Sequence, residues 1–253
     1  MNDIARKTVL FDLPGTADVT VRSNEVERPD GPLDLDCYAP PALAGPLPAV
    51  VIAAGYPDPG FERIVGCRFK DMGSTTSWAR LIAASGMTAL AYTNREPAAD
   101  LEAVLRHVHA NAAALGIDPD RIALWASSGN AAVALGALMT SAVPLARAVL
   151  CYPYTLDLDG ASDIATVAAR FGFATASGSL AGLRPVPLFI ARAGQDEMPS
   201  LNATLDRFVA ACLVRNLPVT LVNQPEAPHA FDLFRDADST RTVVRQILAF
   251  LAA

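Results

Sequence analysis

From Pro48 onward, short apolar runs alternate with longer segments of helical period, and this alternation constrains the fold more than any other feature of the chain. Repeated βα units of this kind build a mostly parallel sheet that helices cover on both faces, so the sequence predicts an α/β fold. The expected strands are apolar on both faces, as covered strands should be. They are Ala49–Ala53, Thr88–Tyr92, Arg121–Trp125, Ala146–Tyr152, Pro187–Ala191 and Val219–Asn223. The expected helices are Ser77–Ser85, Ala99–Leu115, Asn130–Thr140, Ser200–Asn216 and Ser239–Leu251.

The segment before this series has a different pattern. Asp18–Arg22 and Leu33–Tyr38 alternate polar and apolar residues, and the turn-forming residues Arg28–Pro32 lie between them. This arrangement favours an antiparallel hairpin at the edge of the sheet. We therefore expect a mixed sheet with one antiparallel edge.

Length and composition favour one domain. The 253 residues, 52% of them hydrophobic, suffice for one large core, so a single domain spanning 1–253 is expected. Asp157–Pro185 interrupts the βα rhythm with Gly-rich and Ser-rich sequence and a short expected helix at Asp163–Phe171. It is too short for a domain of its own, and we expect a small cap insertion. Together with Tyr56–Ser77, it should shape a pocket at the carboxyl ends of the strands.

Charge and hydropathy exclude several partners. The net charge is −6 and no run of Lys or Arg occurs, so nucleic acid is not expected to bind. No segment reaches the roughly 18 apolar residues of a membrane span, and the first ten residues lack the apolar core of a signal peptide. We expect a cytoplasmic protein without a membrane partner, and its oligomeric state stays open. Free thiols and no metal site are expected for the widely separated cysteines, which are Cys37, Cys67, Cys151 and Cys212.

Ser128 lies where a nucleophile is expected. The strand Arg121–Trp125 continues through Ala126 and a serine pair into Gly129, and a helix follows. A nucleophile elbow needs this strand, turn and helix, with small residues two positions from the nucleophile on each side. Ala126 meets this demand and Asn130 meets it only in part, because the G-x-S-x-G motif has glycine at both positions.

Two alternatives remain for this turn. Ser127 could be the nucleophile if the strand ended one residue earlier. The serines and Asn130 could also form only a polar turn that caps the following helix, a role that Ser and Asn favour. Counting from the start of the strand places Ser128 at the apex.

His229 is the expected general base. It follows the last expected strand and precedes the last helix, so it should lie at the same edge of the sheet as Ser128. A serine hydroxyl needs a base with a pKa near neutrality within hydrogen-bonding reach. The other histidines, His107 and His109, are two residues apart on an expected helix, where their side chains do not face each other and should be surface or packing residues.

Asp196 is the expected acid partner of His229. It follows the strand Pro187–Ala191, and a carboxylate there can reach the far nitrogen of the imidazole and hold its tautomer. The neighbouring Glu197 could serve instead, or Asp196 could only cap the next helix. The chain order Ser128, Asp196, His229 is the order found in α/β-hydrolases.

Two backbone N–H groups are expected to bind the oxyanion. One is that of Gly129, the residue after the nucleophile, and the other should follow an early strand. Tyr56 is favoured because Gly55 precedes it in a turn and Pro57 has no N–H. The same residues could also form a simple turn.

From about Leu33 to Leu251, the chain resembles the dienelactone-hydrolase-like branch of the α/β-hydrolases. The matching pieces are Ala53–Tyr56, the Ser128 elbow, Gly194–Asp196 and His229–Asp232. The resemblance implies the α/β-hydrolase fold, hydrolysis of an ester or lactone through a covalent acyl-enzyme, and no metal or organic cofactor. Dienelactone hydrolases have cysteine as nucleophile, so Ser128 favours a carboxylesterase.

These features predict a serine carboxylesterase for small esters. The alternatives are an acyltransferase using the same triad and a binding protein that retains the scaffold. Aromatic residues near the cap could form a shallow apolar pocket that prefers short acyl groups. They are Tyr152, Tyr154, Phe171, Phe173 and Phe231.

Overall fold

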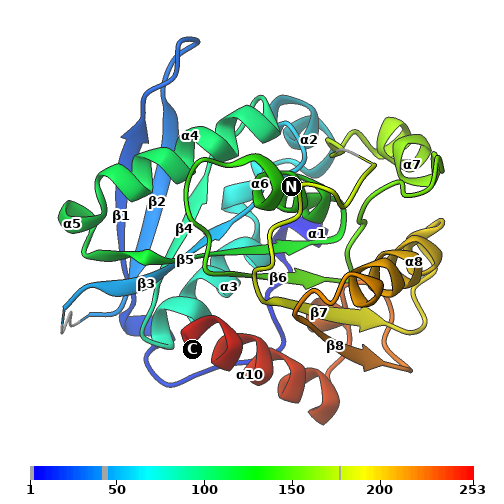
Figure 1. Cartoon of the computed structure of the whole chain (residues 1–253). Coiled ribbons are helices and arrows are strands. Elements are labelled where there is room, and N and C mark those ends of the chain that lie inside the picture. The colour runs from blue at the N-terminus through cyan, green and yellow to red at the C-terminus, as the bar shows by residue number, and fades with distance from the viewer. Residues whose placement is uncertain (1–2, 42–44, 177) are drawn as a thin grey trace.

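A computed structural model describes residues 3–41, 45–176 and 178–253. Its sheet has eight strands in the order β1-β2-β4-β3-β5-β6-β7-β8 (Figure 1). Pairing is antiparallel from β1 to β2 and from β2 to β4, and parallel in the remainder of the sheet. The expected mixed sheet is therefore confirmed. The strands are β1 (Thr20–Val26), β2 (Leu33–Ala39), β3 (Leu47–Ile52), β4 (Thr88–Tyr92), β5 (Ile117–Ser127), β6 (Arg147–Cys151), β7 (Leu188–Ala193) and β8 (Val219–Gln224).

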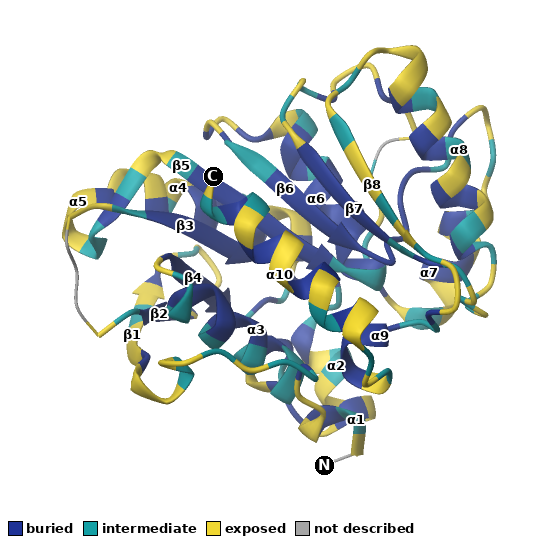
Figure 2. Ribbon diagram, turned by 90° about the horizontal axis from the view of Figure 1, so that it is seen from below, coloured by how far each residue is buried: buried dark blue, intermediate teal, exposed yellow. Residues whose placement is uncertain are grey.

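Helices cover the two faces of this sheet. Trp125 of β5, Val149 of β6 and Phe189 of β7 are register neighbours, so their side chains point to one face. Trp78 packs against Trp125 and Phe250 against Phe189, which places α3 and α10 on that face (Figure 2). The contacting helices α4 and α6 lie on the opposite face. The longer helices are α3 (Gly73–Ala84), α4 (Pro97–Ala110), α6 (Ala131–Thr140), α8 (Leu201–Val214) and α10 (Asp238–Ala252).

Burial separates the central strands from the edges. Every residue of β4 is buried, and β3 is buried from Pro48 onward, as their unbroken apolarity predicts. The prediction of two covered faces is wrong for β8, where Thr220, Leu221 and Asn223 are exposed. β8 has a strand on one side only, and the flanking helices do not cover it fully. Its β-branched sequence therefore indicated a strand but not how far the strand is buried.

Of the two expected pocket-shaping loops, one has the predicted helix and the other contains helices that were not predicted. The insertion after β6 contains α7 (Asp163–Phe171), with the bounds that the sequence indicated. The other segment holds α2 (Asp58–Val65) and η2 (Phe69–Asp71), which were not predicted because Pro57 and Gly60 suggested an irregular loop. The buried Asp58 carboxylate accepts the N–H groups of Phe69 and Asn94, so a contact distant in sequence stabilises this region.

Shorter elements complete the chain. The expected helix Ala99–Leu115 is divided at Asn111 into α4 and α5 (Ala112–Leu115). The others are α1 (Asp3–Arg6), η1 (Thr16–Asp18), η3 (Ser128–Asn130) and α9 (Phe231–Phe234). Within the described residues, no helix has the length and apolar character needed to cross a bilayer.

Candidate active site

Ser128 lies in a strained turn between β5 and α6. Its φ angle of 53° falls in the left-handed region that non-glycine residues rarely adopt, whereas Ser127 is extended with φ −129°. Ser128 is therefore the residue at the apex of the turn. The next residue must be small, because a Cβ on Gly129 would lie 2.5 Å from the Tyr56 hydroxyl oxygen and 2.8 Å from the Phe173 ring.

A continuous chain of hydrogen bonds joins the predicted triad residues. Ser128 Oγ lies 3.0 Å from His229 Nε2, and His229 Nδ1 lies 2.7 Å from Asp196 Oδ2. Since a carboxylate accepts, Nδ1 carries the proton and Nε2 is left as the acceptor for the serine hydroxyl. The Asp196 side chain is fully buried and its other oxygen accepts the N–H of Met198, while Glu197 is exposed.

Different strands bring these side chains together. Ser128 follows β5, Asp196 follows β7, and His229 lies in the loop between β8 and α9. The loops meet because the carboxyl ends of parallel strands share one edge of the sheet. Close packing of the last two loops requires a glycine, since a Cβ on Gly194 would lie 2.4 Å from the carbonyl oxygen of Pro225. His107 and His109 lie on α4, outside this arrangement.

Asn130 connects the elbow to the loop after β3. Its Oδ1 accepts the N–H of Gly55 at 2.6 Å, and both residues are buried. A Cβ on Gly55 would lie 2.8 Å from Asn130 Cα, so the two backbones touch. The departure from the G-x-S-x-G pattern thus has a structural reason. An asparagine at the position where the motif has glycine was the sequence signal for this role, but the sequence indicated for Asn130 only a possible part in capping the helix.

Two N–H groups are available beside Ser128. Gly129 begins a helical turn, where an N–H has no acceptor within the helix. Tyr56 follows the Gly55 N–H that Asn130 holds, and its own N–H has no hydrogen-bond partner in the described part of the chain. The two donors come from the positions that the sequence indicated for an oxyanion hole.

Ser128 and His229 open into a cavity of about 250 Å³ on the face that α3 covers. Its lining is mostly apolar and includes Ile4, Phe61, Phe69, Met72, Trp78, Trp125, Leu233 and Phe234. Asp232 lies in its wall and is fully buried, which raises the pKa of this carboxyl. It accepts hydrogen bonds of 2.8 Å from Trp78 Nε1 and from the Tyr152 hydroxyl. The Tyr152 ring packs edge-on against the His229 ring at 4.9 Å.

The predicted aromatic pocket residues are divided among three places. Tyr152 lines the cavity with Ser128, and Phe171 lines a neighbouring apolar groove of about 390 Å³ beside Tyr56. The structure does not bring the other three into either lining. Tyr154 and Phe173 stack in a small buried cluster between α7 and α8, and Phe231 packs beneath Tyr152. Aromatic composition near the cap did not reveal which rings face the substrate side.

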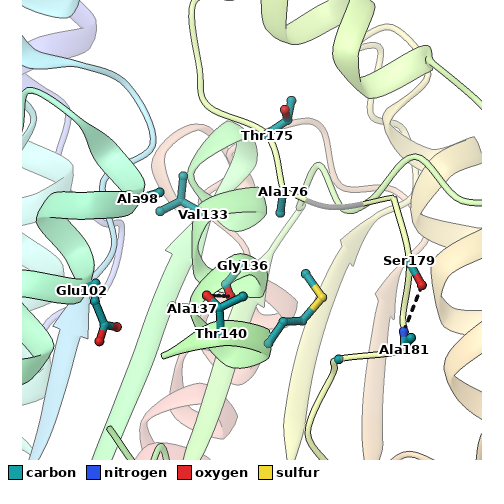
Figure 3. Close-up of a pocket in the computed structure, with 12 residues that line it drawn as sticks. Ala98, Glu102, Val133, Gly136, Ala137, Thr140, Thr175, Ala176, Ser179 and Ala181 are labelled. Carbon is teal, nitrogen blue, oxygen red and sulfur yellow. Dashed lines mark hydrogen bonds between the residues drawn. The ribbon is translucent and has the colours of Figure 1, made fainter. Parts of the chain in front are cut away.

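A separate cavity of about 360 Å³ lies between α4, α6 and the chain after α7 (Figure 3). Small side chains such as Ala98, Ala137 and Ala181 line it, and Glu102 is the only titratable residue among the described residues there. Across all the residues that the structure describes, no group of three or more His, Cys, Asp or Glu side chains is placed to hold a metal ion.

The fold is similar to those of solved hydrolases. A bacterial heroin esterase shares 19% identity at a TM-score of 0.71, over 96% of this chain and 86% of that one. The esterase LipW from Mycobacterium marinum shares 20% identity at a TM-score of 0.70, over 93% of this chain and 82% of that one. MGS-M1, an α/β-hydrolase enzyme from a deep-sea metagenome library, shares 18% identity at a TM-score of 0.67, over 92% of this chain and 96% of that one. No protein-family model and no curated protein sequence matches the chain. The strand order, the helical layers and these similarities together show that the chain has the α/β-hydrolase fold.

Proposed function

We propose that the protein is a serine carboxylesterase that hydrolyses small esters through an acyl-enzyme. The observation that carries this proposal is the hydrogen-bonded chain from Ser128 through His229 to the buried Asp196, at the edge of an apolar cavity. The esterase names of two solved structures with this fold lend support. The motifs quoted above also lead us to propose the dienelactone-hydrolase-like branch, with Ser128 replacing its cysteine.

The first half of the reaction forms the acyl-enzyme. Ser128 Oγ attacks the carbonyl carbon while its proton passes to His229 Nε2, and the carbonyl π electrons move onto the oxygen. Asp196 stabilises the imidazolium through Nδ1. The N–H group of Gly129 and a second donor from Tyr56 stabilise the oxyanion. When the oxyanion collapses, the alcohol oxygen leaves with the electron pair of the broken C–O bond and takes the proton from Nε2.

Water completes the cycle by the same steps. His229 Nε2 accepts a proton from water as the hydroxide oxygen attacks the acyl carbon, and the collapse returns the proton to Ser128 Oγ. An alcohol or amine in the place of water would make the protein an acyltransferase. The buried side chains of Trp78, Trp125 and Asp232 form part of the wall of this cavity of about 250 Å³, and its small volume favours short acyl groups and admits small lactones.

A fluorophosphonate probe tests the proposal most directly. We expect stoichiometric labelling of Ser128, loss of labelling after prior treatment with p-nitrophenyl butyrate in excess, and release of p-nitrophenol in multiple turnovers. Product analysis in water with added alcohol should give mainly the free acid. A folded protein that neither labels nor releases p-nitrophenol would support a binding protein, and a mainly transesterified product would support an acyltransferase.

A further inference from the structure

The side chain of Tyr56 enters the proposed active site separately from its backbone N–H. Its ring packs against Phe61 and Phe173, with a centroid distance of 5.6 Å to each. The contact with Phe173 is edge-on and the contact with Phe61 is tilted, so the ring is held from two sides. The hydroxyl group at its end is therefore fixed in position.

The hydroxyl lies against the elbow. A Cβ placed on Gly129 would be 2.5 Å from the hydroxyl oxygen, so this oxygen lies directly over the residue whose N–H should bind the oxyanion. Tyr56 lines the same cavity as Ser128 and His229. Its hydroxyl also faces Ser128, and the interaction between the two side chains lowers the pKa of Tyr56 in part.

This hydroxyl is protonated at neutral pH, as an ordinary tyrosine hydroxyl is. Burial disfavours its ionisation further and raises the pKa of Tyr56 to about 12, because it raises the pKa more than the interaction with Ser128 lowers it. At neutral pH the group is thus an O–H donor in a mostly apolar cavity. A donor that is fixed before the reaction stabilises developing negative charge without reorganisation.

We propose that the Tyr56 hydroxyl is a catalytic residue that donates a hydrogen bond to the oxyanion beside the N–H group of Gly129. It is the second donor in place of the Tyr56 N–H, because the N–H and the hydroxyl of one tyrosine are too far apart to bond the same oxygen atom. The inference rests on the proposed esterase function and deepens it. In the tetrahedral intermediate, the electron pair from the carbonyl bond resides on the oxygen, and the Tyr56 O–H donates to it while keeping its proton. When the intermediate collapses, the pair re-forms the carbonyl and the hydroxyl turns back to Ser128.

Tyr56→Phe is the decisive variant, because it keeps the ring and the backbone N–H and removes only the hydroxyl. With p-nitrophenyl butyrate, we expect kcat to fall on the order of 100- to 1,000-fold and KM to stay within about twofold, as for other lost oxyanion donors. The Ki of a short-chain trifluoromethyl ketone, which forms a hemiketal oxyanion on serine, should rise by a similar factor. Thermal melting should change little.

Other outcomes have distinct meanings. Unchanged kcat and Ki in Tyr56→Phe, or a rise in KM alone, would overturn the inference while the esterase function stands. A wild-type protein that neither labels with fluorophosphonate nor cleaves an ester would overturn both. Tyr38→Phe is the matched control, since it removes a buried tyrosine hydroxyl from β2, outside the cavity. It should leave kcat and Ki within twofold, which shows that losing a phenol oxygen is not itself the cause.

Discussion

Two cavities of similar size lie in this molecule, and they differ in the polar groups they present. The cavity of Figure 3 has about 360 Å³ and a lining of mostly small side chains, in which the polar groups are the hydroxyls of Thr140, Thr175 and Ser179 and one partly exposed carboxylate. The cavity beside Ser128 has about 250 Å³ and is lined by the Ser128 hydroxyl, the His229 imidazole and the buried Asp232 carboxylate. Volume alone does not distinguish them. Reactivity depends on donors and acceptors that the fold holds toward one point.

Ser128→Ala should have the largest effect, because it removes the hydroxyl that the cavity of Figure 3 has no counterpart for beside a histidine. Without the nucleophile the covalent route is lost, and we expect kcat/KM for p-nitrophenyl acetate to fall by at least about 10⁴-fold with an unchanged melting temperature. The matched variant is Ser127→Ala, which should keep most activity. If Ser127→Ala were the inactive variant and Ser128→Ala stayed within tenfold of wild type, the nucleophile would be misassigned.

Asp196→Asn should reduce kcat on the order of 10⁴-fold, because an amide can hold His229 in the wrong tautomer. Steady-state kinetics across pH would measure this loss. The control is Glu197→Gln, one residue away and exposed, which should change kcat less than threefold. A comparable loss in Glu197→Gln would move the acid by one position.

Acyl length tests the limits of the active cavity. Its small volume predicts that kcat/KM for p-nitrophenyl esters peaks between acetyl and butyryl and falls by about tenfold or more at longer chains. A continuing rise beyond about eight carbons would show that the neighbouring groove along Phe61 and Phe171 accepts the acyl chain.

Asn130→Ala should loosen the oxyanion loop. The buried N–H of Gly55 would lose its acceptor, which costs about 1–3 kcal/mol of folding free energy. We also expect kcat to fall about tenfold, since Tyr56, the residue after Gly55, would no longer be held in position. Urea unfolding and kinetics on one preparation measure both. Asn130→Asp, which retains the acceptor oxygen, should recover part of the lost stability, and no recovery would assign the loss to packing.

Filling the cavity of Figure 3 should have the smallest effect. Ala98 lies at the exposed start of α4, and Ala98→Leu introduces a side chain into this lining without a helix-breaking residue. We expect kcat/KM to stay within twofold. A loss beyond tenfold would show that the two cavities are coupled.

Local sequence patterns predicted the strands and the grouping of Ser128, Asp196 and His229 better than they predicted the other contacts between distant segments. Thr88–Tyr92 has the predicted bounds because an unbroken apolar run directly indicates a strand that is buried on both faces. The triad could be placed because each member follows a strand that could be recognised. Asp232 and its donor Trp78 are 154 residues apart, and no local pattern links them. The same holds for Asn130 and Gly55, whose pairing depends on how two loops meet.

Asp232 also connects the loop after β8 to the N-terminal segment of the chain. Its carboxylate binds Trp78 of α3 and Tyr152 beyond β6, and its carbonyl oxygen accepts the N–H of Leu10 at 2.7 Å. Asp232 lies three positions after His229, so the loop that carries His229 cannot detach without breaking hydrogen bonds to the N-terminal segment and to α3. His229 and the N-terminal segment around Leu10 therefore belong to one cooperative unit, in which amide hydrogens distant in sequence share a single opening equilibrium.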